Sequence, residues 1–405
     1  MDLSVAYSFQ PNLLKKLAAY PSVKEVYAKL DTDLIGGGRS GYTLKKVNKK
    51  TLIKSIEEAK KLKLRFNYLL NAATLDGLEQ TRQGQKKIHR FLDFLTECNV
   101  DTVTVSVPYL LETIKKFHPH FRTKVGVFAK VDTAASAKQW QEMGADCICV
   151  SAISCNRDFD RLISIRDATT CELQLIVNAC CVPSCARELT HMHILTKSSR
   201  TNDSLGGFCL DHCFLSCSSD RLKNPIHLIR SVWIRPEDIT IYESLGYNSF
   251  KIVERSSPAE LILSRVKAYN NRYFEGNLFE LIAPVALIKK QQGVNLADRL
   301  KTLRIFMLPR RVKFSTIMAF KRYAESVIPH QFDKIHAPIY INNRNLDGYL
   351  EQLKQKGCSS TDCKKCSFCE TTAANTVSFN NDLKLRALSY YASLRDSLYS
   401  TEQWL

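Results

Sequence analysis

The length, composition and charge of the chain exclude several classes of protein. It has 405 residues, of which 45% are hydrophobic and 24% are charged, so a disordered or collagen-like chain is excluded. Lys and Arg total 58 against 40 Asp and Glu, and the net charge of +18 favours an anionic partner. No apolar run is long enough for a membrane span, and the N-terminus lacks the layout of a secretory signal. We therefore expect a cytoplasmic protein without a membrane span.

Short β-rich runs alternate with helical patterns over residues 1–272, which is typical of βα units around a parallel sheet. The predicted strands are 3–8, 23–29, 64–70, 102–107, 124–130, 146–152, 173–178 and 249–254. The predicted helices between and after them are 12–20, 49–62, 82–97, 110–117, 134–143, 159–167, 236–246 and 258–269. Eight such units predict an α/β fold of the TIM-like (β/α)8 type, in which chemistry collects at the C-terminal ends of the strands.

Two long connections interrupt this regular alternation. The first contains the glycine-rich run 36–41, for which a ligand loop and a plain flexible turn are both open interpretations. The second is a cysteine-rich insertion at 179–247, after the seventh strand. Beyond the barrel, residues 273–405 are expected to form a smaller C-terminal region, which contains a second cysteine group at 358–369 and ends in a helix over 382–399.

The insertion carries six of the 15 cysteines, and in a reducing compartment clustered thiols indicate metal ligands. Cys181 and Cys185 are four residues apart, as are Cys213 and Cys217, so each pair can direct two thiolates to one centre. Cys209 is an alternative to Cys213 or Cys217. Sulfur ligands suit zinc or an iron–sulfur cluster, and a position at the rim of a barrel favours a 4Fe-4S cluster.

The C-terminal group has the spacing C-x4-C-x2-C-x2-C, formed by Cys358, Cys363, Cys366 and Cys369. This compact spacing resembles an iron–sulfur loop more than the two separated knuckles of a zinc ribbon. A second cluster is therefore predicted here, with zinc, or reduced cysteines without a metal, as the alternatives.

Two blocks of sequence resemble the collagenase-like peptidase U32 family. The first is the run 175–185, which joins an asparagine to paired cysteines and is followed by His191. The second is the run 250–255, which contains Lys251 and Arg255. The run 233–238 and the C-terminal cysteine group also resemble a subgroup of this family.

The resemblance implies an iron–sulfur protein that serves oxygen-independent hydroxylation, or a related modification, of a small molecule or an RNA base. It also implies a second family subunit as a possible partner. On this interpretation His191, Lys251 and Arg255 are candidate catalytic residues, the last two holding carboxylates or phosphates. Asn71, Asn178 and Arg235 are candidate substrate-binding residues, although strand-end amides also cap turns and an arginine also forms structural ion pairs.

Two other functions are open at this point. A peptidase or peptide-maturation factor is one, but the chain contains neither His-Glu-x-x-His nor Gly-x-Ser-x-Gly. The other is a non-catalytic, metal-stabilised RNA-binding protein. A lysine-rich run over 45–65 allows an RNA partner, and a solvated helix face is the simpler explanation because few aromatic residues are interleaved.

Overall fold

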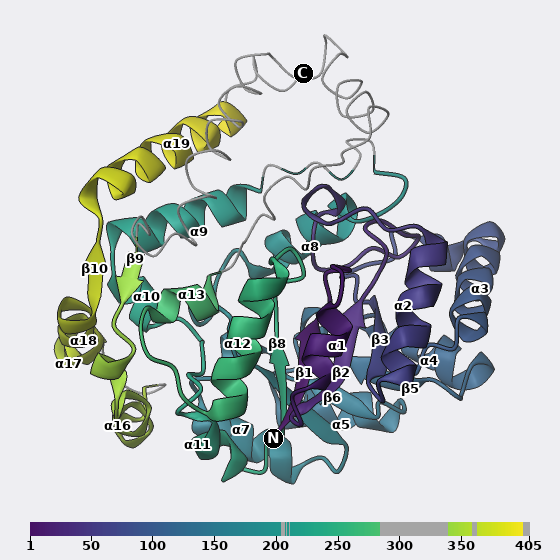
Figure 1. Cartoon of the computed structure of the whole chain (residues 1–405), viewed down its shortest axis with the longest axis horizontal. Coiled ribbons are helices and arrows are strands. Elements are labelled where there is room, and N and C mark those ends of the chain that lie inside the picture. Colours follow the sequence, from purple (N-terminus) through teal and green to yellow (C-terminus); the bar gives the residue numbers. More distant parts are fainter. Residues whose placement is uncertain (204–206, 208, 210, 284–338, 359–362, 400–405) are drawn as a thin grey trace. The chain divides into compact units, whose positions relative to one another are not determined.

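Eight parallel strands close into a barrel in the computed structural model, which describes residues 1–203, 207, 209, 211–283, 339–358 and 363–399. Each strand pairs with the next along the chain, and β1 pairs with β8 to complete the ring (Figure 1). The strands are β1 (Asp2–Ala6), β2 (Val23–Ala28), β3 (Arg65–Leu70), β4 (Thr102–Val105), β5 (Arg122–Val125), β6 (Cys147–Cys149), β7 (Glu172–Ile176) and β8 (Ser249–Ile252). The predicted TIM-like (β/α)8 fold is confirmed.

The chain divides into two compact units, and the barrel belongs to the first, which comprises residues 1–209, 231–274 and 348–362. Its helices are α1 (Leu13–Ala18), α2 (Lys49–Lys61), α3 (Arg82–Glu97), α4 (Pro108–Phe117), α5 (Ala134–Glu142), α6 (Ala152–Cys155), α7 (Phe159–Asp167), α8 (Glu188–Ser198), α11 (Ile239–Glu243), α12 (Ala259–Asn271) and α16 (Tyr349–Lys356). In α3, for example, Ile88, Leu92 and Leu95 form the buried face, and the Thr81 hydroxyl caps the first turn by accepting from Gly84 N.

The inside of the barrel contains a hydrogen-bonded ion pair. The Lys124 ammonium lies 3.0 Å from Glu25 Oε1, and both side chains are almost fully buried. The same carboxylate accepts from the Ser4 hydroxyl at 2.6 Å and from the Asn67 amide at 3.0 Å. Burial opposes the ionised carboxyl, but Lys124 and the two neutral donors outweigh it and lower the pKa of Glu25. The pair therefore stays ionised at neutral pH.

The helix α16 is far from the barrel in sequence but packs within the same unit. Tyr349 lies against Trp233, with ring centroids 5.9 Å apart. The Arg157 guanidinium stacks over the Trp233 ring at 4.3 Å and donates to the Ser231 carbonyl at 2.9 Å. A C-terminal segment thus contributes aromatic surface to the barrel unit.

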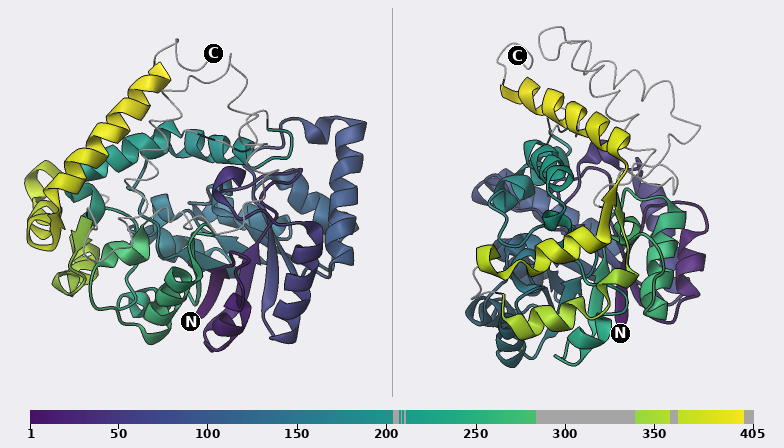
Figure 2. Two further views of the ribbon diagram at one scale, coloured as in Figure 1. Left: turned by 45° about the horizontal axis from the view of Figure 1, so that its top comes forward. Right: turned by 90° about the vertical axis from the view of Figure 1, so that its left-hand side faces the viewer.

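The second unit comprises residues 210–230, 275–347 and 363–405, of which 284–338 lie outside the described residues. Its elements are α9 (His212–Lys223), α10 (Ile226–Ile229), α13 (Leu278–Ile282), β9 (Ile339–Ile341), the short 3-10 helix Arg344–Leu346, α17 (Cys363–Cys366), α18 (Phe368–Thr376), β10 (Val377–Phe379) and α19 (Asn381–Tyr399). The strands β9 and β10 are antiparallel. The long helix α19 packs along α9 (Figure 2), where Tyr399 OH lies 2.8 Å from His212 Nε2.

Candidate functional site

The C-terminal end of β8 places two buried cations at the mouth of the barrel. We define the mouth as the end of the barrel where the C-terminal ends of the eight parallel strands lie. Lys251 is 8% exposed, and its ammonium lies 4.2 Å from the centroid of the Tyr27 ring. Burial, together with the positive charges of Lys124 and then Arg255, lowers the pKa of Lys251. Arg255 is 6% exposed, and its Nη2 has no hydrogen-bond partner in the part of the chain that the structure describes. No described acidic side chain forms an ion pair with either residue.

The neighbouring Glu254 is held by a different arginine. Arg39 forms a bidentate contact with it, in which Nη2 lies 2.8 Å from Oε2 and Nε lies 3.0 Å from Oε1. The Ser256 hydroxyl also donates to Glu254 Oε1, at 2.5 Å. The φ of Glu254 is +104°, a backbone conformation that side-chain-bearing residues rarely adopt. Glu254 therefore forms its ion pair with Arg39. It acts on Arg255 through its charge alone, which partly offsets the lowering of the Arg255 pKa by burial.

A lysine at the end of β2 is a mouth residue that sequence reasoning missed. Lys29 follows the last residue of the strand, is 2% exposed, and lies 2.9 Å from Asp33 Oδ1. Asp33 also accepts from Tyr68 OH at 2.9 Å and from the backbone amides of Ile35 and Gly36. Burial lowers the pKa of Lys29 to about 8 in spite of the Asp33 carboxylate. The signal in the sequence was the i, i+4 spacing of the lysine and the aspartate at a strand end.

Because the pKa of Lys29 is lowered, the free energy of unfolding should depend on pH above pH 8. Between about 8 and the ordinary value of 10.5 the unfolded chain binds more protons at Lys29 than the folded chain, so this residue contributes stability that rises with pH. We expect the free energy of unfolding of the wild type, relative to that of Lys29→Met, to increase from pH 8 to pH 10. Denaturant titrations of both proteins across this interval check it. A difference that is flat or falls with pH contradicts the lowered pKa.

Two neutral polar groups with buried, unpartnered atoms lie at the ends of the next strands. Among the described residues, neither Asn71 Oδ1 nor Ser106 Oγ has a hydrogen-bond partner, and the two side chains are 8% and 6% exposed. A Cβ atom added to Gly37 would lie 2.8 Å from Asn71 Oδ1 and 3.5 Å from the Lys29 ammonium. The backbone at Gly37 thus approaches Asn71 more closely than any larger residue permits.

The glycine-rich loop is anchored at several points. Gly37 N donates to Ser199 Oγ at 2.6 Å, and the same hydroxyl donates back to the Gly37 carbonyl at 3.1 Å. Arg39 binds Glu254 as described above, and the Ser40 hydroxyl donates to the Gly207 carbonyl. The loop is thus hydrogen-bonded both to the residue Glu254 after β8 and to the insertion.

Three predicted site residues lie in other surroundings. Asn178 joins the ends of β7 and β8, since its amide donates to the Val253 carbonyl and accepts from Val253 N. Arg235 is buried and forms a bidentate ion pair with Asp238 at 2.8 and 2.9 Å. His191 is half-buried on α8. Of the predicted catalytic and substrate residues, the structure therefore brings Asn71, Lys251 and Arg255 to the mouth and engages Asn178 and Arg235 in contacts within the fold.

The cysteines of the insertion fall into both compact units. Cys181 and Cys185 belong to the loop between β7 and α8, where Cys181 is exposed, and the Cys181 carbonyl accepts from Val232 N. Cys213 and Cys217 lie four residues apart on α9 in the second unit. Cys217 Sγ accepts a hydrogen bond from Arg221 Nη2 at 2.6 Å and donates to the Phe214 carbonyl at 3.6 Å.

The C-terminal cysteines are likewise divided between the units. Cys358 follows α16, and the other three lie on or next to α17 and α18. Within the described residues there is no group of three or more His, Cys, Asp or Glu side chains arranged to hold a metal ion. The two predicted sets of cysteine ligands thus remain predictions. Their donors are sulfur atoms, the kind of soft ligand that zinc and iron–sulfur clusters take.

Several other cysteines are packed inside the barrel unit. Burial raises the pKa of Cys147 and Cys149, and that of Cys155 to about 12. Because the thiolate is the reactive form, we expect these three to react with iodoacetamide at least about a hundredfold more slowly than the exposed Cys181 in native, metal-free protein. Mass spectrometry of peptides after timed labelling checks this. Equal rates at buried and exposed positions would show that the barrel core opens to solvent.

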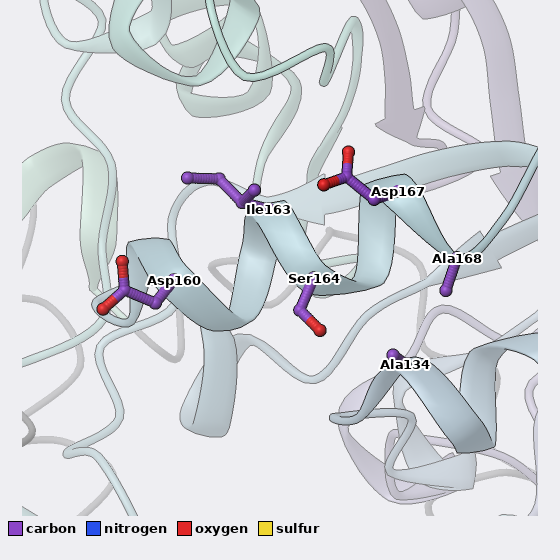
Figure 3. A pocket seen from close by; sticks show the side chains of 6 residues that line it. All are labelled: Ala134, Asp160, Ile163, Ser164, Asp167 and Ala168. Atoms are coloured by element: carbon purple, nitrogen blue, oxygen red, sulfur yellow. The ribbon is translucent and has the colours of Figure 1, made fainter.

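An open hollow of about 630 Å³ lies in the outer helical layer of the barrel unit (Figure 3). Its lining residues are Ala134 of α5 and, on or just after α7, Asp160, Ile163, Ser164, Asp167 and Ala168. It contains no cation, thiol or imidazole, and none of the predicted site residues.

No described helix is long and apolar enough to cross a membrane.

Comparisons with known proteins agree with the family that the two sequence blocks, 175–185 and 250–255, resemble. A family model described as peptidase family U32 matches residues 34–276, more than half of the chain. An uncharacterized protease, MJ1657, from Methanocaldococcus jannaschii is 28% identical over 87% of this chain and 88% of its own length. The solved structure of the U32 peptidase Mk0906 is 18% identical, with a TM-score of 0.47 over 64% of this chain and 94% of that one. A chitinase from Rhizomucor miehei is 11% identical, with a TM-score of 0.36 over 67% of this chain and 100% of that one. On the match of the family model, the chain belongs to peptidase family U32.

Proposed function

We propose that this chain is an iron–sulfur enzyme that carries out oxygen-independent hydroxylation, or a related modification, of an anionic small molecule or an RNA base at the barrel mouth. The observation that carries the proposal is Arg255, a buried guanidinium at the end of β8 that has an unpartnered nitrogen and no acidic partner among the described residues. Burying an unpaired charge costs several kcal/mol by order of magnitude, so such a group is retained where a ligand of opposite charge uses it.

The residues of the mouth have distinct roles in this proposal. Arg255 binds an oxyanion of the substrate, and Lys251 adds a second positive charge from inside the barrel. Burial lowers the pKa of Arg255 to about 10, so it stays protonated at neutral pH. The carboxylate of Glu254 forms its ion pair with Arg39. Asn71, whose amide oxygen is unpartnered in the described chain, accepts from a neutral group of the substrate. His191 stays a candidate for proton transfer.

The cofactor in this proposal is a 4Fe-4S cluster bound by Cys181, Cys185, Cys213 and Cys217. The fit rests on the chemistry of the donors: four thiols in two pairs, with the Cys217 sulfur already hydrogen-bonded by Arg221. When bound, such a cluster supplies one-electron redox chemistry or a Lewis-acidic iron. The second cysteine group, from Cys358 to Cys369, holds a second cluster or a zinc ion.

The similarity to the uncharacterized protease MJ1657 favours peptidase activity as a second candidate. A peptidase needs an activated nucleophile with a base in reach, or a zinc ion with an open position. The thiols of the barrel core are poor nucleophiles because burial raises the pKa of each. A peptidase that uses a cysteine nucleophile would therefore use one of the cysteines of the insertion or of the C-terminal group.

A comparison of cell extracts tests the proposed reaction. We expect a strain that lacks this chain to lose a small molecule or a nucleoside that carries one additional oxygen atom, also when grown without oxygen. Mass spectrometry of metabolites and RNA digests detects it, and wild-type protein but not Arg255→Met restores it. Unchanged metabolites and nucleosides, together with cleavage of casein by the purified wild type, would support the peptidase instead.

A further inference from the structure

The buried charges at the barrel mouth indicate which class of ligand binds there. Four buried or half-buried cations have an acidic partner, in the pairs Lys29–Asp33, Arg39–Glu254, Lys124–Glu25 and Arg200–Asp76. Arg265, on the outer helix α12, donates to the Val253 carbonyl and the Ser257 hydroxyl. Lys251 and Arg255 form no ion pair with a described acidic group, and each is more than nine-tenths buried. The mouth thus holds two positive charges in excess.

These two charges are close enough to affect each other. The positive charge of Arg255 is one of the causes that lower the pKa of Lys251, after burial itself and the charge of Lys124. Arg255 does not lose its charge at neutral pH, since its guanidinium keeps a pKa of about 10. The aromatic face of Tyr27 offers Lys251 only a weak partial compensation, of about 0.5–2 kcal/mol. Two like charges in one buried site therefore require negative charge from outside the fold.

Unpartnered neutral groups point to the same region. Asn71 Oδ1 and Ser106 Oγ are buried without a hydrogen-bond partner among the described residues, at the ends of β3 and β4. Asn71 and Lys29 approach the same point of the Gly37 backbone, and Arg255 is one of the charges that act on Lys29. A ligand bound here satisfies the cations and the neutral polar atoms together.

We propose that the barrel mouth is a binding site for a compact dianion, with two oxyanion charges matched to Arg255 and Lys251 and a polar group matched to Asn71 or Ser106. The site takes either a dicarboxylate or a phosphate monoester, because both present two negative charges over a short span. This inference rests on the proposed function only in placing the ligand at the mouth, and it names the charge class of that ligand.

Thermal unfolding in the presence of simple anions tests the charge count. Malonate is the dicarboxylate probe, inorganic phosphate the phosphate probe and acetate the monoanion, all at one ionic strength set with sodium chloride. We expect malonate or phosphate, at about ten times its Kd, to raise the Tm of the wild type by about 2–4 °C, with acetate at the same concentration giving less than half of this shift. The larger of the two dianion shifts identifies which class the site takes.

Single substitutions test whether Arg255 and Lys251 each bind one negative charge of the dianion. Arg255→Met and Lys251→Met each reduce the dianion shift to the level of acetate, and the double variant shows no anion-specific shift. Lys138→Met and Arg272→Met are matched controls on the outer surface, and both keep the shift of the wild type. Without anions, Arg255→Met unfolds at the same or a higher temperature than the wild type, because it removes an unpaired buried charge; a merely structural arginine gives the opposite result.

The outcomes separate this site from the cluster. Cys181→Ser keeps the dianion shift if the site exists independently of iron, whatever the metal content of the wild type. Equal shifts with acetate and the dianions, or a preference for dianions that survives in the double variant, overturns the dianion site and leaves the iron–sulfur proposal standing. If the wild type contains no iron but still prefers dianions, the iron–sulfur proposal is overturned and the dianion site stands.

Discussion

Glu25→Ala is expected to lower the free energy of unfolding by about 3–5 kcal/mol, since it leaves the buried Lys124 ammonium without its nearest partner, with only Glu172 at 3.9 Å remaining. The two side chains are only 2% and 3% exposed, so water cannot replace the lost carboxylate. The Ser4 hydroxyl and the Asn67 amide lose their acceptor as well. Urea titration monitored by circular dichroism, at pH 7, measures the change.

A surface pair and a double variant give the controls for this prediction. Glu142→Ala removes the exposed partner of Lys138 and should change the free energy of unfolding by no more than about 0.5 kcal/mol. Glu25→Leu with Lys124→Met removes both charges and should recover most of the loss seen with Glu25→Ala. If Glu25→Ala unfolds like the surface variant, the interior ion pair does not stabilise the barrel.

Cys181→Ser is expected to remove one complete cluster, so iron falls by about four atoms per chain while the barrel stays folded. The reason is that a cluster with three thiolates and one hydroxyl is bound far more weakly than one with four thiolates. Cys181 is exposed and packs no core, so loss of iron in this variant does not follow from unfolding. Iron and acid-labile sulfide are measured on oxygen-free protein, and circular dichroism confirms the fold.

Two further cysteine variants make this result specific. Cys171→Ser, which changes a half-buried thiol just before β7, should keep the full iron content. Cys363→Ser should leave the cluster of the insertion intact and remove only the metal of the C-terminal group. Retention of all iron in Cys181→Ser means that this thiol is not a ligand.

Much of the barrel could be predicted from sequence because its elements are local patterns. The bounds of α3 and α7 match the prediction, since each begins at a capping residue and carries regular apolar spacing. The prediction for β6, 146–152, was too long, because the Ser151 side chain caps α6 immediately after the strand. The fifth strand, expected at 124–130, is Arg122–Val125, and a short 3-10 helix follows it.

The candidate site was less predictable because it depends on contacts between distant strands. Lys251 and Arg255 were found from the resemblance of the run 250–255 to the U32 family. For Lys29 the local signal was Asp33 four residues later, a spacing that solvated lysines also show. Its burial follows from Asp33 and Tyr68, the latter on the next strand. For Arg235, the structural alternative was present in the sequence as Asp238 three residues later, and the ion pair that they form is the observed contact.

Elemental analysis of the wild-type protein, purified without oxygen, tests the iron–sulfur claim most directly. We expect a brown protein with about four irons and four acid-labile sulfides for each bound cluster. Colourless protein that contains zinc, or no metal, and lacks acid-labile sulfide would contradict it.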